Sequence, residues 1–115
     1  MTGKANHQAA PYHHNVYVVE LDSSVRDNAR FAAANPGCSP DRPCVYVGLT
    51  GMTPEERFER HKAGIQKSFF VKRYGLRLLP ELYEHLNPMP YEAALRMEEE
   101  LAEDLRAEGY GVWQH

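Results

Sequence analysis

The sequence predicts an α+β domain in which a small sheet is flanked by helices. Short apolar runs rich in β-branched residues alternate with segments of helical spacing, in the order strand, insert, strand, two helices, strand and helix. The chain has 115 residues, which is enough for one domain with a modest core. We expect residues 1–12 to form a disordered tail, because they are polar and lack periodicity, and residues 13–115 to form the domain.

Three segments are predicted as strands. Val16–Leu21 and Val45–Leu49 are apolar and β-branched, as is typical of buried strands. Gly48 interrupts the second run and indicates that another group approaches the backbone closely there. The third strand is Leu76–Tyr83, in which Pro80 implies an edge position or a bulge.

The first two strands are separated by residues 22–43, a segment too long for a hairpin turn. We treat this segment as an insert. Its front half, Ser23–Ala34, carries apolar residues that allow a helix, and the sequence Asn35-Pro36-Gly37 would end that helix. At the other end of the chain, Gly109–His115 is predicted to be a short tail.

The middle helix has the clearest boundaries. Thr53 is placed to cap its N-terminus, Pro54 occupies the first helical position, and Glu56 completes a capping box. Gly64 is expected to end the helix. A second, short helix is predicted over Ser68–Tyr74.

The last helix, Tyr91–Ala107, contains a conflict between pattern and residue type. Its apolar stripe consists of Tyr91, Ala94, Leu95, Leu101, Ala102 and Leu105. Glu98 falls inside this stripe, where a carboxylate is costly unless it is paired or binds a metal. Two interpretations stay open. In the first, Glu98 lies at the edge of the stripe and either snorkels to solvent or pairs with an arginine. In the second, it is buried for a function.

The net charge of −3 hides an uneven distribution. Between Arg57 and Arg77 lie seven basic residues and one acidic residue, whereas the rest of the chain carries six basic and fifteen acidic residues. A basic middle between acidic ends is compatible with a polyanion such as DNA lying across one face. An ordinary solvated helix surface explains the same charges, so the pattern alone leaves both interpretations open.

Composition indicates a protein that is neither inserted in a membrane nor secreted. No apolar run reaches the roughly 18–20 residues that a membrane span needs, and the N-terminus lacks the apolar core of a signal peptide. Cys38 and Cys44 are too few for a disulfide framework, so we expect a cytoplasmic protein. Together with His13 and His14 they offer an alternative zinc site, although their spacing is wider than structural zinc usually has.

Five residues, taken with their order and elements, resemble the signature of the GIY-YIG nuclease family. The sequence Asn-Val-Tyr that ends at Tyr17 occupies the place of the first motif, and Tyr-Val-Gly from Tyr46 matches the second. Arg57 and His61, four residues apart, resemble the helix signature of the family. Glu98 resembles its late helical glutamate, and the resemblance covers nearly the whole chain.

The resemblance implies a single GIY-YIG-like nuclease domain with a three-stranded antiparallel sheet and hydrolysis of DNA phosphodiester bonds that depends on Mg²⁺ or Mn²⁺. It implies that Glu98 holds the metal ion and that Arg57 stabilises negative charge on the phosphate. Tyr17 would act as general base or orient the attacking water. His61 would accept or relay the proton of that tyrosine, and Tyr46 would position water.

The chain departs from the family pattern in three places. Asn15 replaces the glycine of the first motif, and the insert separates Tyr17 from Tyr46 by far more than a short hairpin does. The final asparagine of the family has no clear counterpart. None of these departures removes a predicted catalytic residue, but the insert leaves the strand register open.

Basic side chains near the predicted site are weaker candidates for contact with DNA, namely Arg60, Lys62, Lys67, Lys72 and Arg73. Phe69, Phe70 and Tyr74 lie among them and either stack on bases or anchor the short helix to the core. Because a single domain has little surface for reading sequence, we expect low sequence selectivity, or a protein partner that supplies the target. A catalytically weak nucleic-acid-binding module and a small protein-interaction domain are the alternatives.

Overall fold

The structure, a computed structural model, describes residues 12–65 and 68–114 and is an α+β fold built on one four-stranded mixed sheet. The expected tail therefore lies outside the described residues, apart from residue 12. The elements, in chain order, are β1 (Asn15–Leu21), η2 (Ser23–Asp27), α1 (Ala29–Ala34), β2 (Cys44–Thr50), α2 (Pro54–Ala63), α3 (Phe69–Tyr74), β3 (Gly75–Leu78), η3 (Pro80–Leu82), η4 (Glu84–Leu86), α4 (Tyr91–Ala107) and β4 (Gly111–Gln114).

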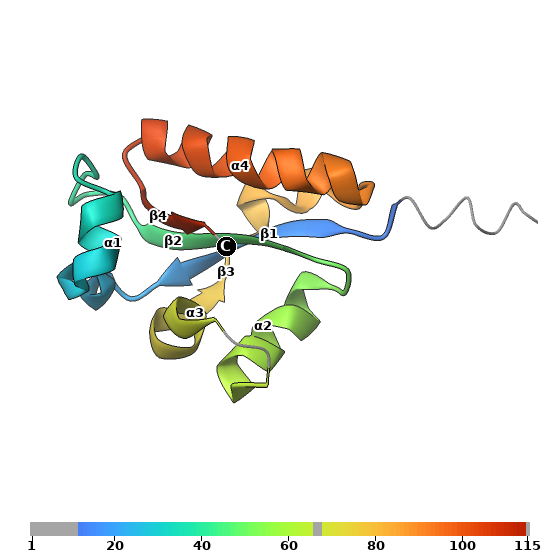
Figure 1. Cartoon of the computed structure of the whole chain (residues 1–115), viewed down its shortest axis with the longest axis horizontal. Helices are drawn as coiled ribbons and strands as arrows, with labels where there is room; N and C mark the ends of the chain where they lie inside the picture. The colour runs from blue at the N-terminus through green and yellow to red at the C-terminus, as the bar shows by residue number, and fades with distance from the viewer. Residues whose placement is uncertain (1–11, 66–67, 115) are drawn as a thin grey trace, which may run out of the picture.

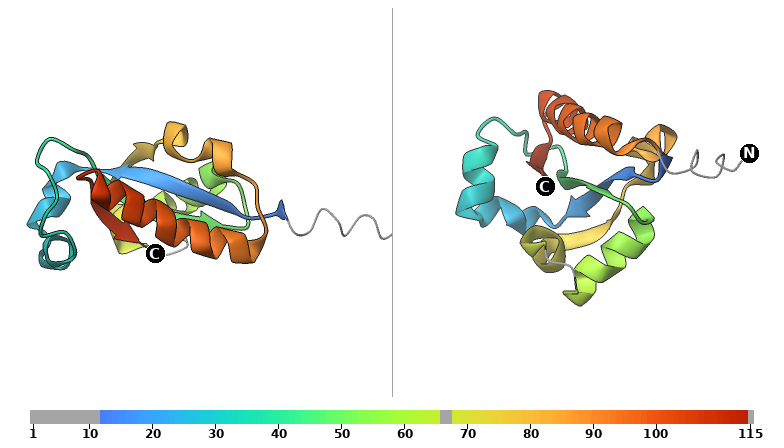
Figure 2. Two further views of the ribbon diagram at one scale, coloured as in Figure 1. Left: turned by 90° about the horizontal axis from the view of Figure 1, so that it is seen from above. Right: turned by 45° about the vertical axis from the view of Figure 1, so that its right-hand side comes forward.

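The sheet has the strand order β3-β1-β2-β4 and helices on both faces. β1 pairs antiparallel with β2 and with β3, whereas β4 pairs parallel with β2. Figure 1 shows α4 above the sheet and α2 and α3 below it, and the right-hand view in Figure 2 keeps the same arrangement. The expectation of three antiparallel strands is therefore correct for β3, β1 and β2 but misses the fourth strand.

β1 and β2 pair over their full lengths, from Asn15 opposite Thr50 to Leu21 opposite Cys44, without a shift in register. The insert of residues 22–43 therefore leaves the register of the first two strands intact. Both strands are buried almost throughout and form the centre of the core. Their runs of valine match the near-continuous apolar pattern of a strand covered on both faces.

The other edge of β1 is completed by several short segments. β3 is shorter than the predicted third strand and pairs only with the last part of β1. Further along, the Asn87 side chain takes the place of a strand: its Oδ1 accepts from the Val16 N–H at 2.9 Å and its Nδ2 donates to the Val16 carbonyl at 2.8 Å. His14 and Met89 then exchange two backbone hydrogen bonds. These contacts satisfy the buried backbone of β1.

The prediction that the C-terminal residues form a tail is wrong, because Gly111–Gln114 forms β4. Asn35 in the insert fixes this strand: its Nδ2 donates to the Val112 carbonyl at 3.0 Å, and its Oδ1 accepts from the Val112 N–H at 2.8 Å. The same Nδ2 donates to the carbonyl of Phe31 at 2.9 Å, and the amide is buried. A four-residue strand with one edge partner lacks a sequence pattern of its own, so only its tertiary contacts identify it.

The predicted helix over Ser23–Ala34 is two pieces, a 3₁₀ turn and α1. The break falls at Asn28, which has an extended backbone and whose Oδ1 accepts from the N–H groups of Arg30 and Phe31. An asparagine side chain that competes for backbone donors favours a new N-cap over continuing the helix.

The boundaries predicted for the other helices are confirmed. Thr53 and Glu56 form the capping box of α2, and Gly64 ends that helix in the left-handed region at φ 79°. α4 spans the predicted residues, but Tyr91 and Leu95 are exposed rather than part of its buried stripe. No helix within the described residues is long and apolar enough to cross a membrane.

We expect Asn35→Ala to unfold more easily than the wild-type protein, by about 2–4 kcal/mol, because buried backbone groups of β4 and α1 lose their partners. Urea denaturation followed by circular dichroism measures the change in the free energy of unfolding. Asn28→Ala is the control, since loss of its cap at the chain surface costs only about 1 kcal/mol. A smaller loss for Asn35→Ala than for Asn28→Ala would contradict this role.

Candidate active site

Three of the five predicted site residues form a buried aromatic cluster between the sheet and α2. Tyr17 comes from β1, Tyr46 from β2 and His61 from the last turn of α2. The Tyr17 hydroxyl lies 3.1 Å from His61 Nε2, and the three ring centroids are 6.1–6.4 Å apart. Tyr17 and His61 are completely buried, and Tyr46 is 2% exposed. The structure therefore brings these three residues together as the sequence predicted.

Gly48 makes this cluster possible. It lies directly opposite Tyr17 in the sheet, and a Cβ atom at this position would lie 2.7 Å from the Tyr17 hydroxyl oxygen. The same Cβ would lie 3.0 Å from the Tyr46 ring. The predicted close approach to the backbone is confirmed, and the approaching group is the Tyr17 side chain.

The remaining two residues, Arg57 and Glu98, both line a pocket at the end of β2. The pocket has a volume of about 390 Å³ and is lined by His14, Leu49, Thr50, Gly51, Met52, Arg57, Tyr91, Leu95 and Glu98. β4 pairs with β2 only as far as Val47, so the last residues of β2 are left uncovered on that edge and form one wall. The pocket thus lies between the start of α2 and the first half of α4.

Glu98 is buried, and it is the carboxylate that the sequence places in the apolar stripe of α4. It is only 5% exposed, and its Oε2 has no hydrogen-bond partner within the described part of the chain. Burial, with a smaller contribution from neighbouring Glu99, raises the pKa of Glu98 from its ordinary value of 4.5 to about 7. Glu98 therefore lies within the buried face of α4 and not at the edge of the stripe.

The two tyrosines differ in how well their environment tolerates a phenolate. Burial raises the pKa of both hydroxyls, and the rise is strongest for Tyr17. For Tyr46, hydrogen bonds with Ser68 and Tyr17 and the charge of Arg57 oppose the rise in pKa. The Glu98 carboxylate acts in the other direction on Tyr46. Tyr46 is therefore electrostatically coupled both to the buried cluster and to the pocket.

One residue that lines the pocket, Glu98, offers a ligand type that hard divalent cations prefer. A buried carboxylate oxygen without a hydrogen-bond partner is a ligand type that Mg²⁺ and Mn²⁺ prefer, and Mg²⁺ commonly keeps most of its waters around one or two protein carboxylates. Across residues 12–65 and 68–114, no three His, Cys, Asp or Glu side chains are grouped to share a metal ion. The alternative zinc site of Cys38, Cys44, His13 and His14 is thus not supported.

Sequence reasoning missed three residues at the site. His14 lines the pocket, its ring tilted against Tyr91 at 4.9 Å. Ser68 contacts Tyr46 through its hydroxyl. Asn15, which replaces the family glycine, donates from Nδ2 to the Met52 carbonyl at 3.0 Å and so braces the turn before α2. No local pattern distinguishes these residues, because their roles arise only when distant segments pack.

The predicted DNA contacts differ in how available their charges are. Lys72 and Arg73 are exposed on α3, and the Arg73 guanidinium lies 5.4 Å from the centre of the Tyr74 ring. The Lys62 ammonium instead donates to the carbonyls of Lys72 and Gly75, at 3.2 and 3.0 Å, and so stabilises the C-terminal end of α3. Lys67 lies outside the described residues.

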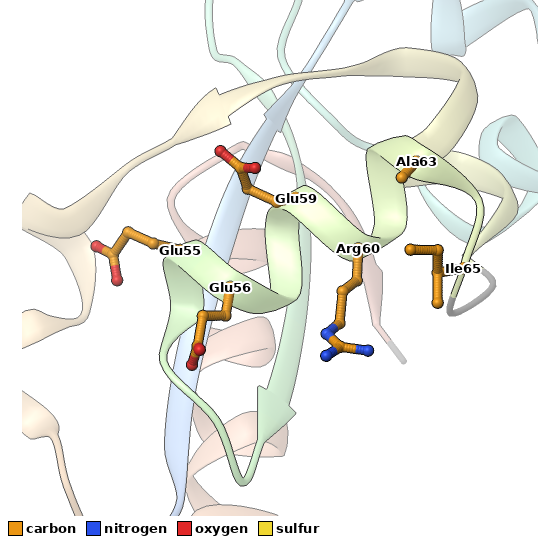
Figure 3. Close-up of a pocket in the computed structure, with 6 residues that line it drawn as sticks. All are labelled: Glu55, Glu56, Glu59, Arg60, Ala63 and Ile65. Atoms are coloured by element: carbon orange, nitrogen blue, oxygen red, sulfur yellow. The ribbon is translucent and has the colours of Figure 1, made fainter.

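Arg60 lies in a second hollow, of about 580 Å³, on the outer face of α2. Figure 3 shows its guanidinium beside this helix, together with the carboxylates of Glu55, Glu56 and Glu59 and the apolar residues Ala63 and Ile65. Three carboxylates repel phosphate, so this larger hollow is not suited to DNA. Arg60 is therefore less available for DNA than Lys72 and Arg73.

Comparisons with protein-family models, with curated proteins and with solved structures find no match.

We expect Gly48→Ala to destabilise the protein by about 1–3 kcal/mol, because the added methyl group collides with the Tyr17 ring. Thermal unfolding followed by circular dichroism measures the effect. Gly37→Ala is the matched control, since nothing lies within 4 Å of a Cβ there and the substitution is expected to be neutral or slightly stabilising. Equal melting temperatures for the two variants would contradict the close packing at Gly48.

We expect Glu98→Gln to be more stable than the wild-type protein at about pH 8, by about 1–3 kcal/mol, and equal to it below pH 4.5. Between pH 4.5 and 7 the folded wild type retains a proton on Glu98 that the unfolded chain has released, so its stability falls as pH rises through this window. The amide does not titrate. Urea denaturation in EDTA at several pH values measures the difference, and a difference independent of pH would contradict the raised pKa.

Proposed function

We propose that the protein is an endonuclease that hydrolyses DNA phosphodiester bonds with the help of Mg²⁺ or Mn²⁺. The observation that carries the proposal is that five residues from β1, β2, α2 and α4 form two groups, a buried cluster and a pocket, which are electrostatically coupled through Tyr46. The five residues are Tyr17, Tyr46, Arg57, His61 and Glu98. The same five residues carry the resemblance to the GIY-YIG nuclease family.

Arg57 supports this proposal through its position in the pocket wall opposite α4. Its planar guanidinium stays charged at every working pH and presents several N–H donors, which match the oxygens of a phosphate. A donor fixed before the substrate arrives stabilises the extra negative charge of the pentavalent transition state without reorganising. We therefore assign Arg57 to the phosphate that is attacked.

The hydrogen-bonded tyrosines and His61 support a path for the proton of the attacking water. Because burial disfavours a free phenolate at Tyr17, this hydroxyl is better suited to relay a proton than to store a charge. In the tautomer that carries hydrogen on Nδ1, the His61 Nε2 atom accepts the Tyr17 proton across 3.1 Å. Tyr46 lies beside Tyr17 and is electrostatically coupled to the pocket, so we assign it the step between the attacking water and Tyr17.

Glu98 is the residue that would hold the divalent cation. When bound, the cation would supply positive charge for the phosphate oxygens and would offset the repulsion between the Glu98 carboxylate and a phenolate at Tyr46. The carboxylate itself is held by the buried face of α4, which keeps it aimed at the pocket in the absence of substrate.

The burial of both tyrosines favours one alternative, a DNA-binding module of the same fold that cleaves weakly. Neither tyrosine lines the pocket, so water reaches their hydroxyls only if the pocket deepens when DNA binds. Binding without cleavage would favour this alternative. The exposed basic residues on α3 are compatible in both cases with contacts to the DNA backbone, which carry no sequence information.

We expect wild-type protein to cleave supercoiled plasmid, branched DNA or single-stranded DNA in Mg²⁺ or Mn²⁺, and Glu98→Gln and Tyr17→Phe each to lower the rate by about 10²–10⁴-fold. Loss of the metal site and of the proton relay are the respective reasons. Tyr83→Phe is the matched control, because Tyr83 is also buried and its hydroxyl has no hydrogen-bond partner within the described part of the chain.

The control variant should retain wild-type cleavage, and circular dichroism should show that all three variants are folded. Cleavage that survives both site substitutions would refute the assignment of the site. Absence of cleavage on every substrate, with DNA binding that weakens steeply as salt rises, would favour the binding module.

A further inference from the structure

We infer that Phe69 at the start of α3 is a stacking platform for an unpaired base of the DNA strand, next to the candidate active site. The inference rests on the proposed function and deepens it, because it names the kind of DNA that the site accepts: a strand with unpaired nucleotides beside the bond that is cleaved.

Phe69 is exposed yet firmly supported. Its side chain is 52% exposed, although it contacts Phe70 and Tyr74 edge to face, with ring centroids 5.3 and 6.2 Å away. Phe70 is buried and packs against Trp113 at 4.4 Å, which ties the cluster to the sheet. Of the alternatives that the sequence leaves open for these rings, Phe70 anchors α3 to the core and Phe69 is left for a ligand.

The surroundings of Phe69 match the chemistry of a nucleotide. A hollow of about 250 Å³ is lined by Gly64, Ser68, Phe69 and Lys72. The Lys72 ammonium lies over Gly64, where an added Cβ would be 3.2 Å from Nζ. An aromatic ring beside a cation is the combination that binds single strands, since the ring takes the base and the cation takes the phosphate.

The hollow is connected to the candidate active site through Ser68. Its hydroxyl interacts with Tyr46, and the next residue along the chain is Phe69. The hollow that holds the ring is thus linked to the buried cluster by one short segment, although it shares no residue with the pocket of Arg57 and Glu98. The base must be unstacked, as it can be in a single strand, because the faces of a base inside a continuous duplex are covered by its neighbours.

Exposure alone does not single out Phe69, because Leu76 on β3 is 53% exposed. Isolated apolar side chains on a surface are common. Leu76 instead lines a different hollow, together with Asp22, Lys62 and Arg73. It follows the C-terminal end of α3, whereas Phe69 lies at the start of that helix. As an exposed aliphatic side chain Leu76 offers no aromatic face to a base, and so it provides a matched control.

The experiment measures binding, in EDTA, of an oligonucleotide that carries 2-aminopurine, whose fluorescence falls when it stacks on an aromatic ring. We expect Phe69→Ala to weaken binding of the single strand about tenfold and to abolish the quenching. Phe69→Trp should restore both, because it keeps an aromatic face. Leu76→Ala should behave as wild type, and a fully paired duplex should bind equally to all four proteins.

Unchanged single-strand affinity and quenching in Phe69→Ala would overturn the platform, as would an equal loss of affinity for single strand and duplex. Cleavage by the wild-type protein is measured separately, with Mg²⁺. Failure to cleave, with quenching that depends on Phe69, refutes the nuclease proposal and supports the platform. Cleavage that does not distinguish Phe69→Ala from wild type on gapped and paired substrates refutes the platform and supports the nuclease proposal.

Discussion

The structure depends most on the pairing of Tyr17 with Gly48 across β1 and β2. Only a residue without a side chain leaves room for the Tyr17 ring to lie over the neighbouring strand. That placement brings the hydroxyl to His61 and the ring beside Tyr46, so one register sets the geometry of the buried cluster. Because a slip of one residue would turn every side chain to the opposite face of the sheet, the register and the site are specified together.

Side chains as well as strands satisfy the backbone hydrogen-bonding groups at the edges of the sheet. Asn87 pairs with the backbone of β1 where β3 has ended, and Asn35 pairs with β4 from the insert. The pocket exists because β4 stops halfway along β2. Within it, Glu98 lowers the stability of the folded chain as pH rises from 4.5 to about 7, a cost that a cation would offset. A group that destabilises the fold but faces a pocket is typical of a functional site.

Much of the local structure was determined by the sequence. The capping box at Thr53, the left-handed stop at Gly64 and the full extent of α4 follow from short-range chemistry that acts within one turn of helix. Glu98 was recognisable because a carboxylate interrupts an apolar helical stripe. Gly48 was recognisable because glycine is out of place in a buried strand.

What the tertiary structure alone decided is the set of contacts between segments distant in sequence. The sequence predicts a tail where β4 forms, because these four residues gain strand character only from β2 and Asn35. His14 and Ser68 joined the site without any local pattern, since their partners lie far along the chain. The exposure of Phe69 beside buried Phe70 likewise depends on which face of α3 meets the sheet. Periodicity predicts the burial of a face, but the neighbour that covers it is chosen by packing.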